Sequence, residues 1–289
     1  MQNGIDNYQG EDLIIITGAP GTRWSASIQS ITSHPDINLS DQTDDRTYER
    51  TASYEDGKKA GIGWHRGVYF GPCHEFGKTF DNLEAWTKEE LLLEFKKAFS
   101  DWETGIKIVK SHWFAYGLDH LKKCFPKAKI IAYYLPDELC LRWWQVVGGF
   151  DIEYPHYDWY ETNERMLQQI KIENACSIKF AAETGAKFKR YKSLADLHTD
   201  LGLDPSQVSY TDVWDRDPKI QTLAEQLGDG DWDLDTSEGR DAYTKHMLDD
   251  RTKATMTMVY NPDVEYTDHI INQNLIDSTV KVINKYGRK

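Results

Sequence analysis

The sequence predicts an α/β fold in which a parallel sheet is flanked by helices. Short apolar runs at residues 12–17, 106–109 and 128–135 are rich in Ile and Val, as buried strands are. Segments with helical spacing of apolar residues separate these runs, and strands that alternate with helices form parallel sheets. The first run leads directly into small residues. This places a turn at the carboxyl end of a strand, where such folds bind their ligands.

Each further element has its own local signal. A helix over residues 23–32 follows the first strand. A second helix over residues 87–102 has Thr87 as its N-cap and Glu90 at the capping-box position. The remaining expected elements are a surface excursion at 33–60, a structured loop at 61–80, helices near 116–124, at 136–147 and from about 157 to 183, and a short strand at 187–191.

Length and composition indicate a single domain over residues 1–289. We expect an α/β core over about 12–204 and a mostly helical C-terminal part over about 205–289. A net charge of −13 argues against nucleic acid or an anionic membrane as a partner, because both require clustered Lys and Arg. The four cysteines form no C-x-x-C pair, so we expect reduced thiols and no metal site. Without a signal-peptide pattern or a membrane span, the expected location is the cytoplasm.

The stretch 17-TGAPGTRWSAS-27 has the outline of a phosphate-binding loop. The nucleotide-hydrolase pattern is G-x-x-x-x-G-K-[ST]; Gly18 and Ser25 fit it, but the second Gly and the Lys are missing. The first N–H groups of a helix can still bind an anion, and Arg23 adds a positive charge there. The alternative is a tight turn between strand and helix that binds no ligand.

The stretch 107-KIVKSHWF-114 places Lys110 and His112 at the end of the second expected strand. The carboxyl ends of neighbouring parallel strands lie at one edge of a sheet. A cation and an imidazole are therefore expected beside the loop that begins at Gly18. Histidine suits a general base because its ordinary pKa lies near neutrality. The alternative is a histidine in an ordinary connecting loop.

Together these stretches resemble the sulfotransferase family. The loop 20-PGTRWS-25 is similar to the family pattern P-[KR]-S-G-T-[ST], and Lys110, Ser111 and His112 match its K-[TS]-H motif. The stretch 125-FPKAKIIAYYLPDELCLRWW-144 keeps most of the residue types and the spacing of a third family motif. The stretch 188-FKRYKSLADLHTDLGLD-204 is similar to a late strand and helix of the family. The resemblance covers about residues 12–204 in collinear order.

The resemblance implies a fold like that of P-loop-containing nucleoside triphosphate hydrolases and transfer of a sulfuryl group without a metal. The implied donor is 3′-phosphoadenosine 5′-phosphosulfate, with His112 as general base and with Lys110 and Ser25 stabilising the reacting oxygens. Arg142 is expected at the 3′-phosphate and Tyr191 near the adenine. The implied donor-binding loop consists of Pro20, Gly21, Thr22, Arg23, Trp24 and Ser25.

The chain also departs from the family pattern. Gly21 replaces the usual Lys or Arg after the loop proline, Tyr134 replaces an Arg, and Arg142 replaces a Ser that shares the 3′-phosphate. Because a guanidinium binds phosphate through two hydrogen bonds, we expect Arg142 to compensate.

The acceptor is expected to be a small molecule or a carbohydrate with a hydroxyl or amine. Its pocket is expected from residues 64–76, Trp113 and residues 150–160, although such aromatics also fill cores. Two other functions stay open: a P-loop kinase of a small molecule, and a non-catalytic nucleotide-binding relative of the sulfotransferases. The C-terminal part is a candidate cap over the donor or a homodimer surface.

Overall fold

The structure is a computed structural model of the chain. It describes residues 7–22, 24–40, 68–70, 82–146, 162–189, 191, 194–208, 255–266 and 273–286. The regular elements in chain order are β1 (Leu13–Gly18), α1 (Trp24–Ile31), β2 (Val68–Tyr69), η2 (Leu83–Ala85), α3 (Lys88–Lys97), β3 (Lys107–Lys110), η3 (His112–Gly117), α4 (Leu118–Cys124), β4 (Lys129–Tyr134), α5 (Asp137–Val146), α6 (Asn163–Thr184), α7 (Leu194–Asp200), η6 (Pro205–Gln207), β5 (Met256–Tyr260) and α11 (Gln273–Tyr286).

The described strands form one sheet in the order β2-β3-β1-β4-β5. β1 is central and pairs in parallel with β3 and with β4, while β2 pairs in parallel with β3. β5 runs antiparallel to β4. The protein therefore has the expected α/β fold with helices around a mostly parallel sheet. The all-parallel expectation needs correction at β5, which comes from the C-terminal part expected to be mostly helical.

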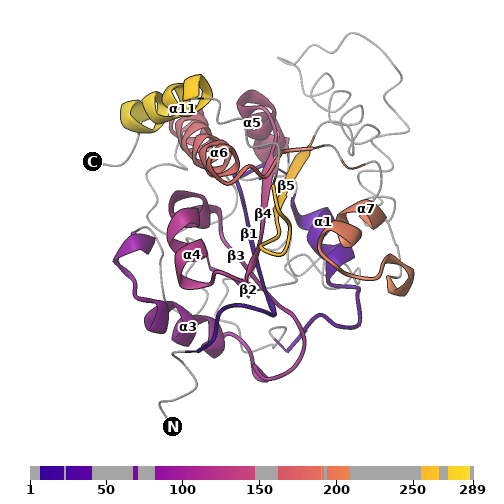
Figure 1. The fold of residues 1–289 in the computed structure, drawn as a ribbon. Coiled ribbons are helices and arrows are strands. Elements are labelled where there is room, and N and C mark those ends of the chain that lie inside the picture. Colours follow the sequence, from indigo (N-terminus) through magenta and orange to yellow (C-terminus); the bar gives the residue numbers. More distant parts are fainter. Residues whose placement is uncertain are drawn as a thin grey trace, which may run out of the picture.

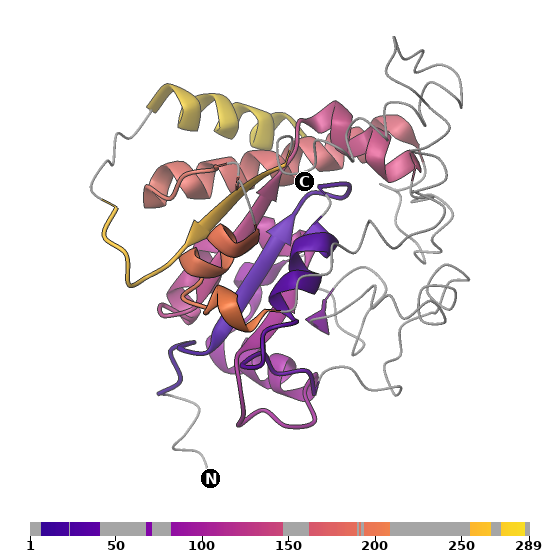
Figure 2. The same ribbon diagram turned by 90° about the vertical axis from the view of Figure 1, so that its right-hand side faces the viewer.

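Helices cover both faces of the sheet (Figures 1 and 2). α3, α4 and α6 lie on one face, and α11 lies along the outer side of α6. α1 and α7 cover the other face, where they contact each other. α5 follows β4 and packs against α6 beyond the carboxyl end of the sheet.

Every residue of β1 is buried, which explains why its sequence is a continuous apolar run and not an alternating one. Leu13 and Ile15 belong to the core on the α3, α4 and α6 face, whereas Ile14 and Ile16 belong to the core on the α1 and α7 face. Burial of one such side chain stabilises the fold by about 1.5–3 kcal/mol. β1 thereby holds both layers together and fixes the position of the loop that follows it.

Local signals located the start of α3 correctly, but the helix ends at Lys97 and not at residue 102 as expected. Thr87 caps α3 in a complete capping box with Glu90, as predicted. The helix expected near 116–124 is a 3-10 segment, η3, that continues into α4. The strand expected at 187–191 is reduced to one antiparallel bridge, between Lys189 and Thr257. β2 lies inside the stretch that was expected to be a loop; of residues 61–80, the structure describes only 68–70.

Candidate functional site at the carboxyl edge of the sheet

The parallel pairing of β1 with β3 brings the two motif segments to one edge of the sheet. Ile16 lies opposite Lys110, and the Ser111 N–H donates to the Ile16 carbonyl over 3.1 Å. The Thr17 hydroxyl donates to the Ser111 carbonyl over 2.8 Å and so ties the ends of the two strands together. The loop after β1 and the segment after β3 are therefore neighbours.

His112 directly contacts the start of the loop. Its Nδ1 lies 2.5 Å from the Gly18 carbonyl oxygen. Because a carbonyl only accepts hydrogen bonds, Nδ1 carries the proton and Nε2 of the neutral ring has the lone pair. The indole of Trp24 stacks on the imidazole with a centroid separation of 4.3 Å and an interplanar angle of 17°. Both groups fix the orientation of the ring.

Burial lowers the pKa of His112 to about 4, since a charged ring is poorly solvated there. The Lys110 ammonium lowers the pKa further, and the hydrogen bond to Gly18 partly opposes both effects. His112 is therefore neutral near pH 7 and can accept a proton at Nε2. An anion bound nearby would raise this pKa and make the imidazole a stronger base.

Ser111, the middle residue of the motif, has a structural role. Its side chain is fully buried, and its hydroxyl accepts from the Trp113 N–H over 3.1 Å as the N-cap of η3. Trp113 is 1% exposed in the core beside α3 and α4, so it fills the core and does not line an acceptor pocket. The other expected acceptor-pocket residues lie outside the described residues, except for 68–70.

The loop from Ala19 to Thr22 is a tight turn. The Thr22 N–H donates to the Ala19 carbonyl over 3.1 Å, with Pro20 in second position and Gly21 in third at φ +86°. This combination of proline and positive φ is that of a type II turn. The Thr22 hydroxyl also donates to the Ala19 carbonyl, over 2.7 Å. Both Thr22 donors are thus used inside the turn, in contrast to a loop whose successive N–H groups all face a phosphate.

α5 explains why position 21 has no basic side chain. A Cβ added to Gly21 would lie 2.0 Å from the Cys140 carbonyl oxygen, far closer than atoms can approach. The positive φ of Gly21 further disfavours any side chain there. The departure from the family pattern at Gly21 therefore follows from the packing of α5 on the turn. Any positive charge for an anion must come from other positions.

Arg23 and the side chain of Ser25, both expected in the donor-binding loop, lie outside the described residues, whereas the backbone of Ser25 belongs to the first turn of α1. The first four N–H groups of a helix have no partners within it. The first turn of α1 consequently offers backbone donors next to the turn that ends at Thr22.

Arg142 and Tyr191 have local partners. Arg142 is half-buried on α5, and its Nη1 lies 3.5 Å from Gln145 Oε1. The Tyr191 hydroxyl donates to Asp200 Oδ2 over 2.5 Å, and its ring lies in the core cluster that includes Trp24.

Sequence reasoning missed Thr17 and Cys140, which position this edge. A proline followed by glycine is a turn signal and could have predicted the closed turn. The contact between Gly21 and Cys140 could not be predicted from a local sequence pattern, because it depends on how α5 packs against the turn. Within the described parts of the chain, no three His, Cys, Asp or Glu side chains gather as metal ligands. No helix in those parts is long and apolar enough to cross a membrane.

The chain matches no protein family model, no curated protein and no solved structure.

Proposed function

We propose that the protein transfers a sulfuryl group from 3′-phosphoadenosine 5′-phosphosulfate to a hydroxyl or amine of a small molecule or sugar. The contact between His112 Nδ1 and the Gly18 carbonyl carries this proposal. It holds a neutral imidazole, with its Nε2 lone pair, beside the turn and the start of α1. A base next to a helix N-terminus suits the transfer of an anionic group.

In the proposed reaction, His112 Nε2 takes the proton of the acceptor O–H or N–H. A bond forms between the acceptor atom and sulfur, the bond from sulfur to the bridging oxygen breaks, and adenosine 3′,5′-bisphosphate leaves. Lys110 and Ser25 stabilise the charge that develops on the bridging oxygen, as fixed donors do in related phosphoryl transfers. No step requires a metal.

Binding of the donor is assigned to the loop and to two later residues. The Gly21 N–H and the N–H groups at the start of α1, together with Arg23, bind the 5′-phosphosulfate. Arg142 binds the 3′-phosphate, and Tyr191 lies near the adenine. The bound charge would raise the pKa of His112 toward the neutral range.

A thermal-shift experiment with adenosine 3′,5′-bisphosphate against ATP and Mg²⁺ tests this function. A ligand at 100 times its Kd stabilises the folded protein by about 2.7 kcal/mol. Stabilisation by the bisphosphate alone supports the sulfotransferase. Stabilisation by ATP and Mg²⁺ alone supports the kinase. No response to either contradicts both and favours a relative that has lost nucleotide binding.

The assignment of Arg142 has a separate test. Arg142→Ala is expected to weaken bisphosphate binding by about 10-fold or more, because a charge-assisted contact contributes about 1.5–3 kcal/mol. Arg165→Ala, which removes an exposed guanidinium from α6, is the matched control. Unchanged affinity in Arg142→Ala would remove this residue from the site without affecting the assignment of His112.

A further inference from the structure

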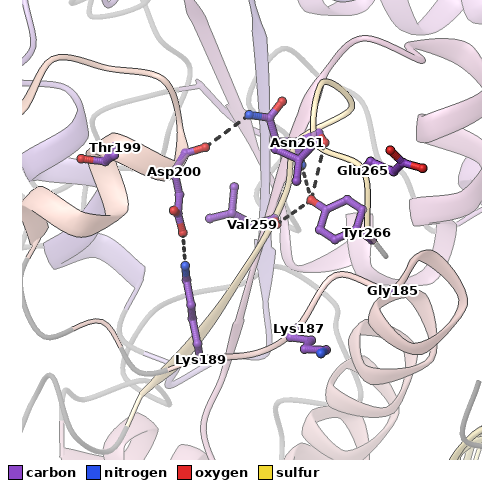
Figure 3. A pocket seen from close by; sticks show the side chains of 10 residues that line it. Gly185, Lys187, Lys189, Thr199, Asp200, Val259, Asn261, Glu265 and Tyr266 are labelled. Atoms are coloured by element: carbon purple, nitrogen blue, oxygen red, sulfur yellow. Dashed lines mark hydrogen bonds and ion pairs between the residues drawn. The ribbon is translucent and has the colours of Figure 1, made fainter. Parts of the chain in front are cut away.

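A cavity of about 490 Å³ lies at the outer edge of β5 (Figure 3). Its walls come from the segment after α6, the end of α7 and the turn after β5. Lys187 and Glu265 line it with exposed side chains, and Lys189 forms an ion pair with Asp200. Charges of both signs thus surround this cavity, and two of them are paired with each other.

The Tyr266 hydroxyl contacts the backbone beside this cavity. It accepts from the Asn261 N–H over 2.8 Å and donates toward the Val259 carbonyl over 3.2 Å. The bridge between Lys189 and Thr257 pairs the backbone at the other end of β5. These polar groups hold the edge of the sheet together.

At the carboxyl edge, the indole of Trp24 lies face to face with the imidazole of His112. The ring centroids are 4.3 Å apart, and the two planes differ by 17°. An aromatic face has a negative electrostatic potential and attracts a cation within about 6 Å of its centroid, and the face of tryptophan attracts most strongly. The stack therefore favours the protonated imidazole over the neutral one.

The fold fixes the position of the indole. Trp24 is the first residue of α1, and its side chain is 8% exposed. It belongs to the same core cluster as Ile28 and Ile31 of α1 and Tyr133 of β4. Because protein cores are densely packed, the indole cannot turn away from His112 without opening this cluster. The contact between the two rings is therefore a lasting part of the folded protein.

Other groups around His112 shift its pKa in both directions. Burial and the Lys110 ammonium on β3 favour the neutral ring. The Gly18 carbonyl on β1 favours the protonated ring, because a charged Nδ1–H is the stronger donor. Among the charged side chains that the structure describes, Lys110 is the one that acts on the ring; Arg23, next to α1, lies outside them. The indole and the carbonyl thus oppose burial and Lys110.

We propose that Trp24 is a positioning residue for the transfer, and that its indole stabilises the imidazolium formed when His112 takes the proton of the acceptor. This role rests on the proposed function where turnover is concerned. The acceptor proton moves to Nε2 as the bond to sulfur forms, and the ring later releases that proton to water. Because the ring becomes positive only as it takes the proton, its attraction to the indole is stronger in the transition state than in the ground state and raises kcat.

NMR titration of the histidine rings in the full-length protein tests the stack without any turnover. Trp24→Phe keeps a weaker aromatic face, and Trp24→Leu keeps an apolar side chain without one. The pKa of His112 is expected to be highest in the parent protein and lowest in Trp24→Leu, where the proton affinity of the ring should fall about 3- to 10-fold. His198, which lies beside Ser30 further along α1, is the internal control and should titrate as in the parent. A pKa of His112 in Trp24→Leu equal to or above that of the parent overturns the proposal.

Fluorinated tryptophan tests the same contact without removing packing. Uniform 5-fluorotryptophan withdraws electron density from the indole face but keeps its shape, so this protein should fold even where Trp24→Leu does not. The pKa of His112 should be lower in the fluorinated parent, whereas fluorination of Trp24→Phe should leave it unchanged. An unchanged pKa in the fluorinated parent, or an equal fall in Trp24→Phe, contradicts the proposal.

Turnover measurements separate this role from the proposed function. In Trp24→Leu, kcat for sulfuryl transfer should fall about 3- to 10-fold, and the acid limb of kcat against pH should move to lower pH, while KM for the donor stays within about twofold. Trp24→Phe should recover most of kcat. If neither the parent nor the variants transfer a sulfuryl group, the proposed function fails, and the order of the pKa values still decides whether the stack favours the protonated ring. An equal fall in kcat in both variants without movement of the acid limb would give Trp24 a purely structural role and overturn the proposal.

Discussion

The carboxyl edge of the sheet and the outer edge of β5 differ in how tightly the chain packs around them. At the carboxyl edge, Gly21 is in contact with Cys140, His112 is buried against Trp24, and Lys110 is buried as well. At the outer edge of β5, charged side chains are exposed around an open cavity. The described residues of the first region are closely packed, and those of the second surround an open cavity.

The side chains of the two regions are therefore suited to different tasks. A buried imidazole has a fixed tautomer and a shifted pKa, which are properties that catalysis requires. Exposed charges around a cavity stay in contact with solvent and are suited to reversible binding. Substitutions at the carboxyl edge should therefore have large effects on turnover or on stability. Substitutions around the cavity should have small effects on stability.

The largest expected effect is that of His112→Ala on turnover. Loss of a general base lowers kcat by about 10²–10⁴-fold, and binding of adenosine 3′,5′-bisphosphate should be retained. Sulfuryl transfer to a panel of phenols, alcohols and sugars measures the first quantity, and the thermal shift measures the second. His198→Gln, which removes another buried histidine, is the control. Full activity of His112→Ala would end the assignment of His112 as the base.

Gly21→Ala tests how closed the carboxyl edge is. The new Cβ would collide with the Cys140 carbonyl at a residue with φ +86°, so we expect the free energy of unfolding to fall by about 3 kcal/mol or more. Gly202→Ala is the matched control. Gly202 also has a positive φ, but its nearest contact is the end of the Lys129 side chain at 3.3 Å, and the expected cost is about 1 kcal/mol. Equal costs in urea unfolding would show that the contact with α5 is unimportant.

Acid should destabilise the protein through its buried histidines. Burial lowers the pKa of His112 and of His198 to about 4, and the nearby His34 also lowers that of His198. Unfolded histidines titrate near about 6.5, so between these pH values the unfolded state binds more protons. The free energy of unfolding should then decrease as pH falls from about 6.5 to about 4, by at most about 3 kcal/mol per histidine.

Urea unfolding at several pH values measures this dependence. His198→Gln should reduce its slope, because glutamine does not titrate but can still bond to the Ser30 hydroxyl, which lies 3.1 Å from His198 Nε2. An identical slope in the variant and the parent protein would mean that His198 keeps its ordinary pKa in the folded state.

The smallest effect is expected around the cavity. Lys187→Gln and Glu265→Gln should each change the free energy of unfolding by less than about 0.5 kcal/mol, since exposed charges contribute little. Chemical denaturation measures this change. A loss above about 1 kcal/mol in either variant would show that the rim of the cavity has a structural role and would remove the contrast with the carboxyl edge.

The elements with local signals could be predicted from the sequence. β1, β3 and β4 are apolar runs, and the capping box of Thr87 and Glu90 is a short-range pattern. β5 was missed because its five residues, MTMVY, become a strand only by pairing with β4, which lies more than a hundred residues earlier. Pairing over such a distance leaves little trace in local sequence.

The residues of the site also divide into those that local patterns predict and those that depend on packing between distant segments. The meeting of His112 with Gly18 follows from the rule that parallel strands end at one edge, so the sequence could predict it. The stacking of Trp24 on the imidazole and the approach of Cys140 to Gly21 depend on side-chain packing and helix placement. The assignments of Arg23, Ser25, Arg142 and Tyr191 to a bound donor stay predictions.

The hydroxyl of Tyr266 has a consequence for self-association. Sheets with long uncovered margins readily template one another into aggregates, and natural proteins shorten or block those margins. Here one phenol occupies the backbone at Asn261 and Val259, and the bridge at Lys189 closes the other end of β5. Tyr266→Phe should therefore make the protein more prone to precipitate on storage while leaving its core unchanged.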